Sequence, residues 1–342
     1  MRYTSKGALH LHTIHSDGTG TIPQIAQDAK KAGLDWIIIT DHNNLAGLHN
    51  NEEGWYDDVA VIVGEEVSPE NSDHYLAFGI TKPVSGNLSP KEIIKEVKAQ
   101  GGLGFIAHPD ESKNRRNKYP PLRWTDWNLQ GFDGIEIWNY TSDWIDNYDE
   151  RFGFLHFIQK HRRLKGPTKD LLNWWDSLNN ANCKVVPAVG SLDTHAFKVG
   201  ILTIFPYQHN LKTITNHIIL ENPLSKDFNE AKQQVFKALR RGNNIIVNRI
   251  WNKNTEEPYF SIITDDVETF PGNTARINSS SKLVIKLPAK GKIRLIHNGD
   301  PVYENITTEV EYNRLAPGKY RFEAYLGNKP WIYSNPIMCE QS

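Results

Sequence analysis

The pattern of apolar positions divides the chain near residue 251. Before that point, short apolar runs alternate with stretches in which apolar residues recur every three or four positions. The short runs are typical of buried strands, and the longer spacing is typical of amphipathic helices. The expected strands are residues 7–12, 36–40, 59–63, 103–107, 134–138, 184–189, 199–205 and 244–248. The expected helices begin near residues 21, 89, 168 and 228.

Strands that alternate with helices predict parallel pairing through right-handed crossovers. About seven strands of this kind favour a closed or nearly closed β/α barrel over an open sheet. The helix boundaries agree with this division: Ser89-Pro90-Lys91-Glu92 is a capping box with proline at the first helical position. Gly242 follows the last expected helix as a C-terminal stop signal.

After Trp251 the helical spacing disappears. Short β-type runs follow one another, and turn signals such as Asn298-Gly299-Asp300 and Ala316-Pro317-Gly318 separate them. This pattern predicts a small antiparallel, immunoglobulin-like β-sandwich. The expected domains are therefore a hydrolase barrel over residues 1–252 and a β-sandwich accessory domain over residues 253–342.

Residues 111–166 form a long and mostly irregular stretch around the expected strand at residues 134–138, and long loops in compact domains are often functional. Its aromatic residues either stack on a substrate or, more commonly, pack an insertion onto its barrel. They are Trp124, Trp127, Trp138, Tyr140 and Trp144. Glu136 alternates with Ile135 and Ile137, so it either supports a site from inside the barrel or is a paired core carboxylate.

Histidines and carboxylates follow the ends of the expected strands. They are His10, His12, Asp17, Asp41, His42, Glu65, Glu66, His74, His108, Asp193 and His195. Residues at the same end of neighbouring strands converge on one edge of a sheet or barrel. His10 and His12 are two positions apart on one strand, so both point to the same face, an arrangement that suits Zn, Mn or Fe.

Each of these features has an ordinary structural explanation when taken alone. A pair of core histidines, a helix-capping aspartate at Asp41 or an exposed glutamate would suffice. Only one of Glu65 and Glu66 can point inward, and His74 stands at the head of a further apolar run. Chance does not explain why such side chains follow five separate strands, so the sequence predicts a hydrolase built on clustered metal ions.

Composition narrows the class of protein. The chain has 342 residues and a formal net charge of −1, so no global field favours nucleic acid or an anionic membrane. No apolar run is long enough to span a bilayer, and the first residues lack a secretion core. Two distant cysteines exclude a disulfide framework and fit a reducing cytoplasm, although a removed leader stays open.

The motifs resemble those of the polymerase and histidinol phosphatase (PHP) family of metal-dependent hydrolases. The resemblance covers about residues 7–250 and rests on Leu9-His10-Leu11-His12-Thr13, Ser16-Asp17-Gly18, Ile39-Thr40-Asp41-His42-Asn43, Gly64-Glu65-Glu66, Ala107-His108-Pro109 and Asp193-Thr194-His195. It implies a distorted (β/α)7 barrel with a trinuclear centre. Leu192 is an extra residue before the last motif, and the ending Trp331–Ile337 looks like the tails of some bacterial members.

The resemblance also implies a division of the ligands among three ions. It selects Glu66 over Glu65 and gives the first ion the ligands His10, His12, Glu66 and Asp193. The second ion shares Glu66 and adds His74 and His108, and the third has Asp17, His42 and His195. We therefore expect two or three divalent ions, which are Zn, Mn or Fe.

The expected activity is that of a phosphoesterase in which a metal-activated hydroxide attacks a small phosphorylated metabolite or nucleotide. Asp17 or His195 would assist proton transfer to the leaving group, and Lys113, Arg115 and Arg116 would cradle the phosphate. The alternatives are an ester, amide or carbamate hydrolase on the same centre, or an inactive binding module. Neutral charge and the lack of a basic stripe argue against a nucleic-acid substrate. The pattern gives no indication of the oligomeric state.

Overall fold

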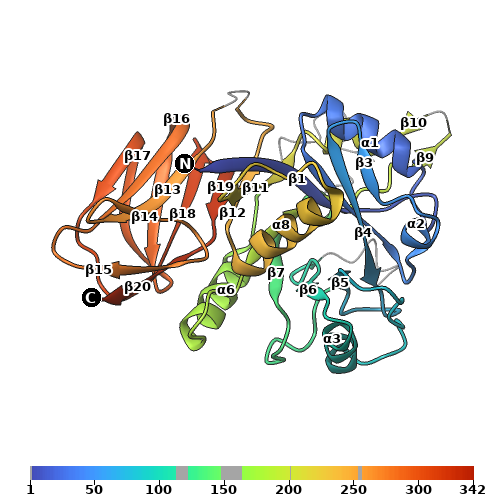
Figure 1. Ribbon diagram of the computed structural model, residues 1–342, viewed down its shortest axis with the longest axis horizontal. Coiled ribbons are helices and arrows are strands. Elements are labelled where there is room, and N and C mark those ends of the chain that lie inside the picture. The colour runs from blue at the N-terminus through green and yellow to red at the C-terminus, as the bar shows by residue number, and fades with distance from the viewer. Residues whose placement is uncertain (1, 113–121, 148–163, 201, 253–255) are drawn as a thin grey trace.

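The computed structural model describes residues 2–112, 122–147, 164–200, 202–252 and 256–342 (Figure 1). The expected phosphate-binding residues Lys113, Arg115 and Arg116 lie outside these residues. The helices are α1 (Ile22–Lys31), α2 (Ala46–His49), α3 (Pro90–Ala99), α4 (Tyr140–Asp146), α6 (Lys169–Ala181), α7 (Tyr207–Asn210) and α8 (Phe228–Arg241).

Strands occur along the whole described chain. Those before residue 252 are β1 (Tyr3–Leu11), β2 (Trp36–His42), β3 (Gly54–Tyr56), β4 (Val59–Val67), β5 (Tyr75–Phe78), β6 (Leu103–Ile106), β7 (Gly134–Asn139), β8 (Ala188–Ser191), β9 (Lys198–Val199), β10 (Leu202–Thr203), β11 (Ile214–Leu220) and β12 (Asn244–Asn248). Those after it are β13 (Tyr259–Thr264), β14 (Val267–Thr269), β15 (Thr274–Ile277), β16 (Lys282–His297), β17 (Asp300–Tyr312), β18 (Gly318–Leu326), β19 (Lys329–Ser334) and β20 (Ile337–Gln341).

The central strands pair in the order β11, β1, β2, β4, β5, β6, β7 and β8. The pairs β1–β2, β2–β4, β6–β7 and β7–β8 are parallel, as expected for strands joined through helices. The pairs β4–β5, β5–β6 and β1–β11 are antiparallel, which corrects the expectation of parallel pairing throughout. A short loop with no helix joins β4 to β5, so the chain turns back directly.

The sheet topology does not confirm the expected closed barrel. No β1–β8 ladder is present in the described chain, and the link between these regions is one isolated bridge between Leu11 and Thr194. Backbone hydrogen bonds support the bridge: the Leu192 N–H donates to Leu9 O at 3.2 Å and the His12 N–H to Thr194 O at 3.1 Å. The segment after β8 therefore lies beside the end of β1.

The sheet is covered on both faces, which explains why its strands are apolar at successive positions. Ile37 and Ile39 belong to the same core cluster as Ile25 and Ala29 of α1. Ile38 alternates with them and belongs to a second cluster with α8. The caps agree with the sequence signals, because Ser89 and Glu92 form the reciprocal capping box at the start of α3.

The secondary structure differs from the expectation in one predicted strand and in one strand that was not predicted. The expected strand at residues 199–205 is replaced by β9 and β10, which are two residues long each and form a separate sheet. The strand β11 (Ile214–Leu220) was not expected, because Asn216 and His217 interrupt its apolar run. Both polar side chains are buried and hydrogen-bonded, so the strand is internal despite them.

The C-terminal strands continue from the same network of paired strands. β12 pairs antiparallel with β19, and the core of this region includes Phe260, Phe322 and Trp331 (Figure 1, orange and red). The region is all-β in its described residues, as expected. A sandwich and a boundary at residue 252 stay predictions. In the described chain, no helix is long and apolar enough to cross a bilayer.

Candidate metal centre

The backbone at the end of β1 is irregular where the first histidines lie. The pairing of β1 with β2 shifts between Leu9 and Leu11, and His10 has a φ of 66°. His108 and Asp193 also have positive φ values, of 27° and 49°. Residues other than glycine seldom adopt this backbone conformation, and backbone strain of this kind clusters at functional sites. The rings of His10 and His12 nevertheless lie side by side at this irregularity, with centroids 5.2 Å apart.

Glu66 lies at the centre of the histidine cluster. Its Oε1 is 2.9 Å from His74 Nδ1 and 3.1 Å from His108 Nε2. Its Oε2 is 2.9 Å from His42 Nδ1, 3.3 Å from His10 Nε2 and 3.4 Å from His12 Nε2. Glu66 therefore contacts histidines on both of its oxygens, the arrangement expected of a carboxylate that bridges two ions.

Glu65 and His74 were open choices in the sequence, and the structure places both. Glu65 is buried away from the cluster and accepts a hydrogen bond from the Val84 N–H at 2.9 Å. His74, at the head of β5, is buried beside Glu66, and its ring centroid is 5.1 Å from that of His108. Glu66 and His74 are thus the members of the cluster.

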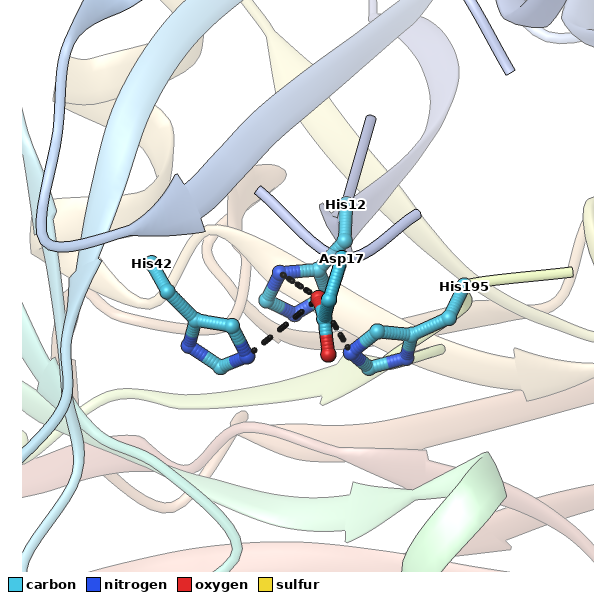
Figure 2. A group of neighbouring side chains, drawn as sticks. All are labelled: His12, Asp17, His42 and His195. Atoms are coloured by element: carbon cyan, nitrogen blue, oxygen red, sulfur yellow. Dashed lines mark ion pairs between the residues drawn. The ribbon is translucent and has the colours of Figure 1, made fainter. Parts of the chain in front are cut away.

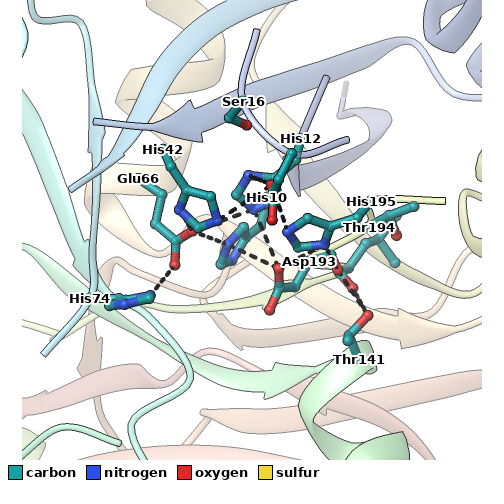
Figure 3. A network of polar contacts seen from close by, with 12 residues as sticks. His10, His12, Ser16, His42, Glu66, His74, Thr141, Asp193, Thr194 and His195 are labelled. Carbon is teal, nitrogen blue, oxygen red and sulfur yellow. Dashed lines mark hydrogen bonds and ion pairs between the residues drawn. The ribbon is translucent and has the colours of Figure 1, made fainter. Parts of the chain in front are cut away.

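Asp193 approaches the first histidine pair from the turn after β8 (Figure 3). Its Oδ1 is 3.3 Å from His12 Nε2 and 3.6 Å from His10 Nε2. Thr141 holds the turn, because its hydroxyl contacts the carbonyl oxygens of Leu192 and Asp193 at 2.9 Å each. The extra residue Leu192 is fully buried, so it serves as a packing anchor at this turn.

Asp17 lies between three histidines on the exposed side of the cluster (Figure 2). Its Oδ1 is 3.2 Å from His195 Nε2, 3.6 Å from His42 Nε2 and 3.9 Å from His12 Nδ1. The Asp17 side chain is 50% exposed, whereas those of His12 and Glu66 are 0% and 1% exposed. The Asp17 group is therefore the side of the centre that solvent or a substrate reaches.

The nine residues expected as ligands fall into four overlapping groups whose ligand atoms lie within 4.8 Å of one another. These groups are His12, Asp17, His42 and His195; His10, His12 and Glu66; His10, His108 and Asp193; and Glu66, His74 and His108. The last of these groups is the set expected for the second ion, whereas Asp193 groups with His10 and His108, and His12 joins the Asp17 group as well. The division of the ligands among ions stays a prediction.

Several buried nitrogen and oxygen atoms of the cluster, each able to bind a metal ion, lack a hydrogen-bond partner among the described residues. They are His10 Nε2, both ring nitrogens of His12, and Glu66 Oε2. Buried polar atoms without partners are costly, and convergent imidazole and carboxylate atoms are the donor set that divalent Zn, Mn and Fe prefer. The cluster therefore fits metal ions.

Electrostatics favours binding of cations. Burial raises the pKa of Asp193, but His10, His12 and His195 more than offset this and hold it well below its usual range. Burial and the neighbouring His195 lower the pKa of His12 to about 3, so its imidazole is neutral and can donate a lone pair. The cluster thus combines an ionised carboxylate with a neutral ring.

Three residues that sequence reasoning did not assign support the cluster. Glu136 Oε1 lies 2.7 Å from His10 Nδ1, and its Oε2 accepts the His108 N–H at 2.8 Å. Asp41 accepts the Thr13 N–H at 2.7 Å and the Ser16 hydroxyl at 2.6 Å, which shapes the loop that carries Asp17. The alternation of Glu136 with Ile135 and Ile137 had marked it as a candidate supporting residue. No local sequence pattern marked the third supporting residue, Tyr207.

Tyr207 joins the loops of the exposed side. Its hydroxyl donates to His12 O at 2.7 Å and accepts the N–H groups of Thr19 and Gly20 at 3.2 Å each. It also lies 3.2 Å from His195 O. One hydroxyl on the short helix α7 therefore holds the backbones that carry His12, Asp17 and His195.

The aromatic residues of the long irregular stretch pack into the fold. Trp124, Trp138 and Tyr140 are almost completely buried. Trp127 meets Trp174 edge to face at 4.5 Å, and Trp144 meets Phe205 at 4.8 Å. An aromatic ring that does lie beside the cluster is Phe197, which stacks on His195 at 4.7 Å.

Comparison with known proteins finds similarity in the N-terminal part of the chain. The model of the PHP domain family matches residues 8–165. An uncharacterized protein of Methanocaldococcus jannaschii is 29% identical over 161 residues, which are 42% of this chain and 86% of the relative.

Two solved structures resemble this chain at low sequence identity. A two-domain Bacteroides vulgatus protein containing a predicted PHP-like metal-dependent phosphoesterase covers 98% of this chain and 95% of its own, with a TM-score of 0.48 and 14% identity. The lesion-specific endonuclease Q of Pyrococcus furiosus covers 78% and 64%, with a TM-score of 0.44 and 15% identity. The expectation that nucleic acid is not a substrate stays a prediction.

The family match includes the segments that supply His10, His12, Glu66 and His108, and these side chains meet in one buried cluster. The segment formed by residues 8–165 is therefore similar to the PHP domain family.

Proposed function

We propose that the protein is a metal-dependent phosphoesterase that hydrolyses a small phosphorylated metabolite or nucleotide. The observation that carries the proposal is the position of Glu66, which contacts five histidines through its two oxygens. A single ion does not need so many donors, whereas two or three ions held side by side do.

The ligands divide among three positions in this proposal. His10, His12, Glu66 and Asp193 hold the first ion, and Glu66, His74 and His108 hold the second. Asp17, His42 and His195 hold the third, on the exposed side. Ions at these positions would supply Lewis-acid activation of a water molecule and charge neutralisation on the phosphoryl oxygens.

The protein's own groups would orient the reaction and move the proton. Glu136 fixes the ring of His10, and Asp41 fixes the loop of Asp17. In the described chain, Asp17 contacts its three neighbouring histidines through Oδ1. Oδ2 of this half-exposed carboxylate is therefore available to pass a proton to the leaving group, with His195 Nε2 at 3.2 Å from Oδ1 as its neighbour.

The phosphate itself needs a positive cradle. Lys113, Arg115 and Arg116 follow His108 closely in the sequence, and we keep them as the predicted phosphate-binding residues. They lie outside the described residues, so their assignment rests on the sequence alone.

A second candidate is hydrolysis of a carboxylic ester, amide or carbamate by the same centre. Two apolar side chains, one stacked on a cluster histidine and one exposed in a neighbouring loop, suit this reaction as well. Phe197 stacks on His195, and Ile14, in the loop that carries Asp17, is 54% exposed. Such side chains suit a substrate with an apolar leaving group, which an aryl phosphate and an aryl ester both have.

The test is a turnover screen of protein loaded with Zn, Mn or Fe. Nucleotides, sugar phosphates and an aryl phosphate are assayed for phosphate release, with aryl acetates and carbamates in parallel. We expect phosphate release that is lost in Asp193→Asn. Turnover of carbonyl substrates alone would replace the phosphoesterase with the second candidate. No turnover with any metal would favour an inactive binding module.

A further inference from the structure

A cavity lies away from the metal centre, lined by residues of β1, β11, β12 and the C-terminal strands β16 and β19. Its volume is about 570 Å³, within the range of pockets that hold small molecules. Its lining includes Lys6, Ala32, Lys212, His217, Arg249 and Trp331. Lys6 precedes His10 by four positions on β1, which corresponds to about 13 Å along a strand.

Arg249 is the cation that most needs a partner in this cavity. In the described chain its guanidinium makes one hydrogen bond, from Nη1 to Ala32 O at 2.9 Å. No carboxylate of the described residues lies within ion-pair distance of it. Burial lowers the pKa of Arg249, and Glu257 and Asp35 offset this only from a distance. A half-buried guanidinium without a carboxylate presents free N–H donors to the cavity.

The acidic group nearest to Arg249 already has other partners. The Glu257 carboxylate is 2.6 Å from Lys6 Nζ and contacts His217 Nδ1 with its other oxygen. Burial raises the pKa of Glu257, but His217 and Lys6 more than offset this and lower it to about 2, so the carboxylate stays ionised and engaged. The other acid of the lining, Glu256, is exposed to solvent.

The remaining lining is positive at one side and apolar at the other. Lys31 and Lys212 are exposed at the rim, and no carboxylate of the described residues pairs with Lys212. The lining therefore carries four cationic side chains against two carboxylates. Val247, Ile250, Pro288 and Trp331 supply an apolar wall.

We propose that this cavity binds a small molecule that carries a carboxylate or phosphate group on an apolar body. The anionic group would receive the free N–H donors of Arg249, whose planar guanidinium matches either group with two parallel hydrogen bonds. Lys212 would add charge at the rim, and the apolar body would lie against Val247 and Trp331. The cavity is separate from the phosphoesterase proposal and does not depend on it.

Calorimetric titration of the full chain with two probes tests the proposal. The probes are 3-phenylpropionate and phenylphosphonate, and 3-phenylpropanol is the uncharged control. We expect one of the anions to bind with saturation and the alcohol not to bind. Arg249→Gln should weaken binding about tenfold to a hundredfold, because it removes a charge-assisted pair. Lys212→Ala, at an exposed side chain, gives the same direction without risk to folding.

Two further variants make the result decisive. Lys95→Ala removes an exposed lysine on α3 and should leave binding unchanged. Asp193→Asn disables the metal centre and should also leave binding unchanged. Loss of binding in Asp193→Asn alone would mean that the probe occupies the metal centre, which overturns the proposal. Failure of both anions to bind, or equal binding by the alcohol, would overturn it as well.

Discussion

Glu136 shows how one buried carboxylate orders two segments of the metal centre. It contacts the ring of His10 at Nδ1, so the other nitrogen, Nε2, faces Glu66 and Asp193. Its second oxygen accepts the backbone N–H of His108 and the side-chain amide of Asn139. A carboxylate that fixes the ring and tautomer of a metal-binding histidine also raises its basicity.

We expect Glu136→Gln to weaken metal binding about tenfold to a hundredfold. A neutral amide would hold the ring of His10 less firmly and would not raise the basicity of its metal-binding nitrogen as a carboxylate does. Metal affinity measured by competition with a chelator checks this. Glu65→Gln is the matched control, since Glu65 is equally buried, accepts one N–H from Val84 and does not contact the cluster. Equal effects of the two variants would remove Glu136 from its positioning role.

The histidines of the metal-free centre predict a pH dependence of metal binding. Burial lowers the pKa of His42, but Glu66 and Asp17 more than offset this and raise it to about 9. Burial likewise lowers that of His108, but Glu66 and Glu111 raise it to about 10. Both rings are therefore protonated near neutral pH, and an incoming ion must displace these protons.

Affinity for Zn or Mn should accordingly rise between pH 6.5 and pH 8.5, and binding should release protons. Calorimetry in two buffers with different ionisation enthalpies measures the number released. A flat affinity profile with no proton release would contradict the arrangement of charges around His42 and His108.

At the residue scale, the sequence predicted the cluster and, as one of two alternatives, the supporting role of Glu136, but not the other supporting residues. The nine expected ligands share a signal, because each is a histidine or carboxylate near the end of an apolar run. Tyr207 and Asp41 act through backbone groups of distant loops, and no local pattern marks such contacts. Glu66 could be separated from Glu65 only by resemblance, and the fold then shows Glu65 facing Val84.

At the scale of elements, the helix α7 links the ligand loops although it has only four residues. Tyr207 holds the loops of the exposed side, and Asn210 donates to the Thr194 hydroxyl at 2.9 Å. The two residues thus contact the backbone or neighbours of three ligands from one short helix.

Tyr207→Phe should loosen the Asp17 side of the centre, because it leaves His12 O and the N–H groups of Thr19 and Gly20 without the hydroxyl. We expect a loss of about 1–3 kcal/mol in the free energy of unfolding and weaker binding of the most exposed ion. Chemical denaturation and metal titration measure the two effects. Tyr259→Phe removes a hydroxyl from β13 and should leave metal binding as it is; an unchanged metal titration in Tyr207→Phe would contradict the role of α7.

Element boundaries were predictable where local chemistry marks them, as with the capping box of Ser89 and the left-handed Gly242 after α8. Pairing direction was not, because residues 68–73 between β4 and β5 mark a turn but do not determine that the next strand returns antiparallel. The strand β11 was missed because Asn216 and His217 look like loop residues, and only distant partners such as Gly190 and Glu257 satisfy them.

At the scale of the whole molecule, buried charges attach the C-terminal strands to α6. Arg321 forms a two-fold contact with Asp176, from Nε to Oδ1 and from Nη2 to Oδ2 at 2.7 Å each, and its Nη1 contacts Glu323 at 2.8 Å. Lys319 donates to the carbonyl oxygens of Asn179, Asn182 and Lys184 at the end of α6. The predicted division at residue 252 therefore separates regions that share charge pairs and the β12–β19 ladder.

Asp176→Ala should lower the free energy of unfolding by about 3 kcal/mol, because it leaves the buried Arg321 with one carboxylate in place of two. Thermal unfolding measures the loss. The triple variant Asp176→Leu with Arg321→Met and Glu323→Gln should recover much of it, since the buried cation and both of its buried carboxylate partners are removed together. Unchanged stability in Asp176→Ala would show that this contact does not hold the two regions together.

The measurement that tests the central claim most directly is anomalous X-ray scattering from crystals grown with Mn or Zn. Two or three ions should appear among His10, His12, Glu66, His108, Asp193 and their neighbours, with the most exposed ion beside Asp17, and Asp193→Asn should lose at least one. Crystals of the folded protein that show no ion at this cluster, or ions bound elsewhere with the cluster closed by hydrogen bonds, would contradict the account.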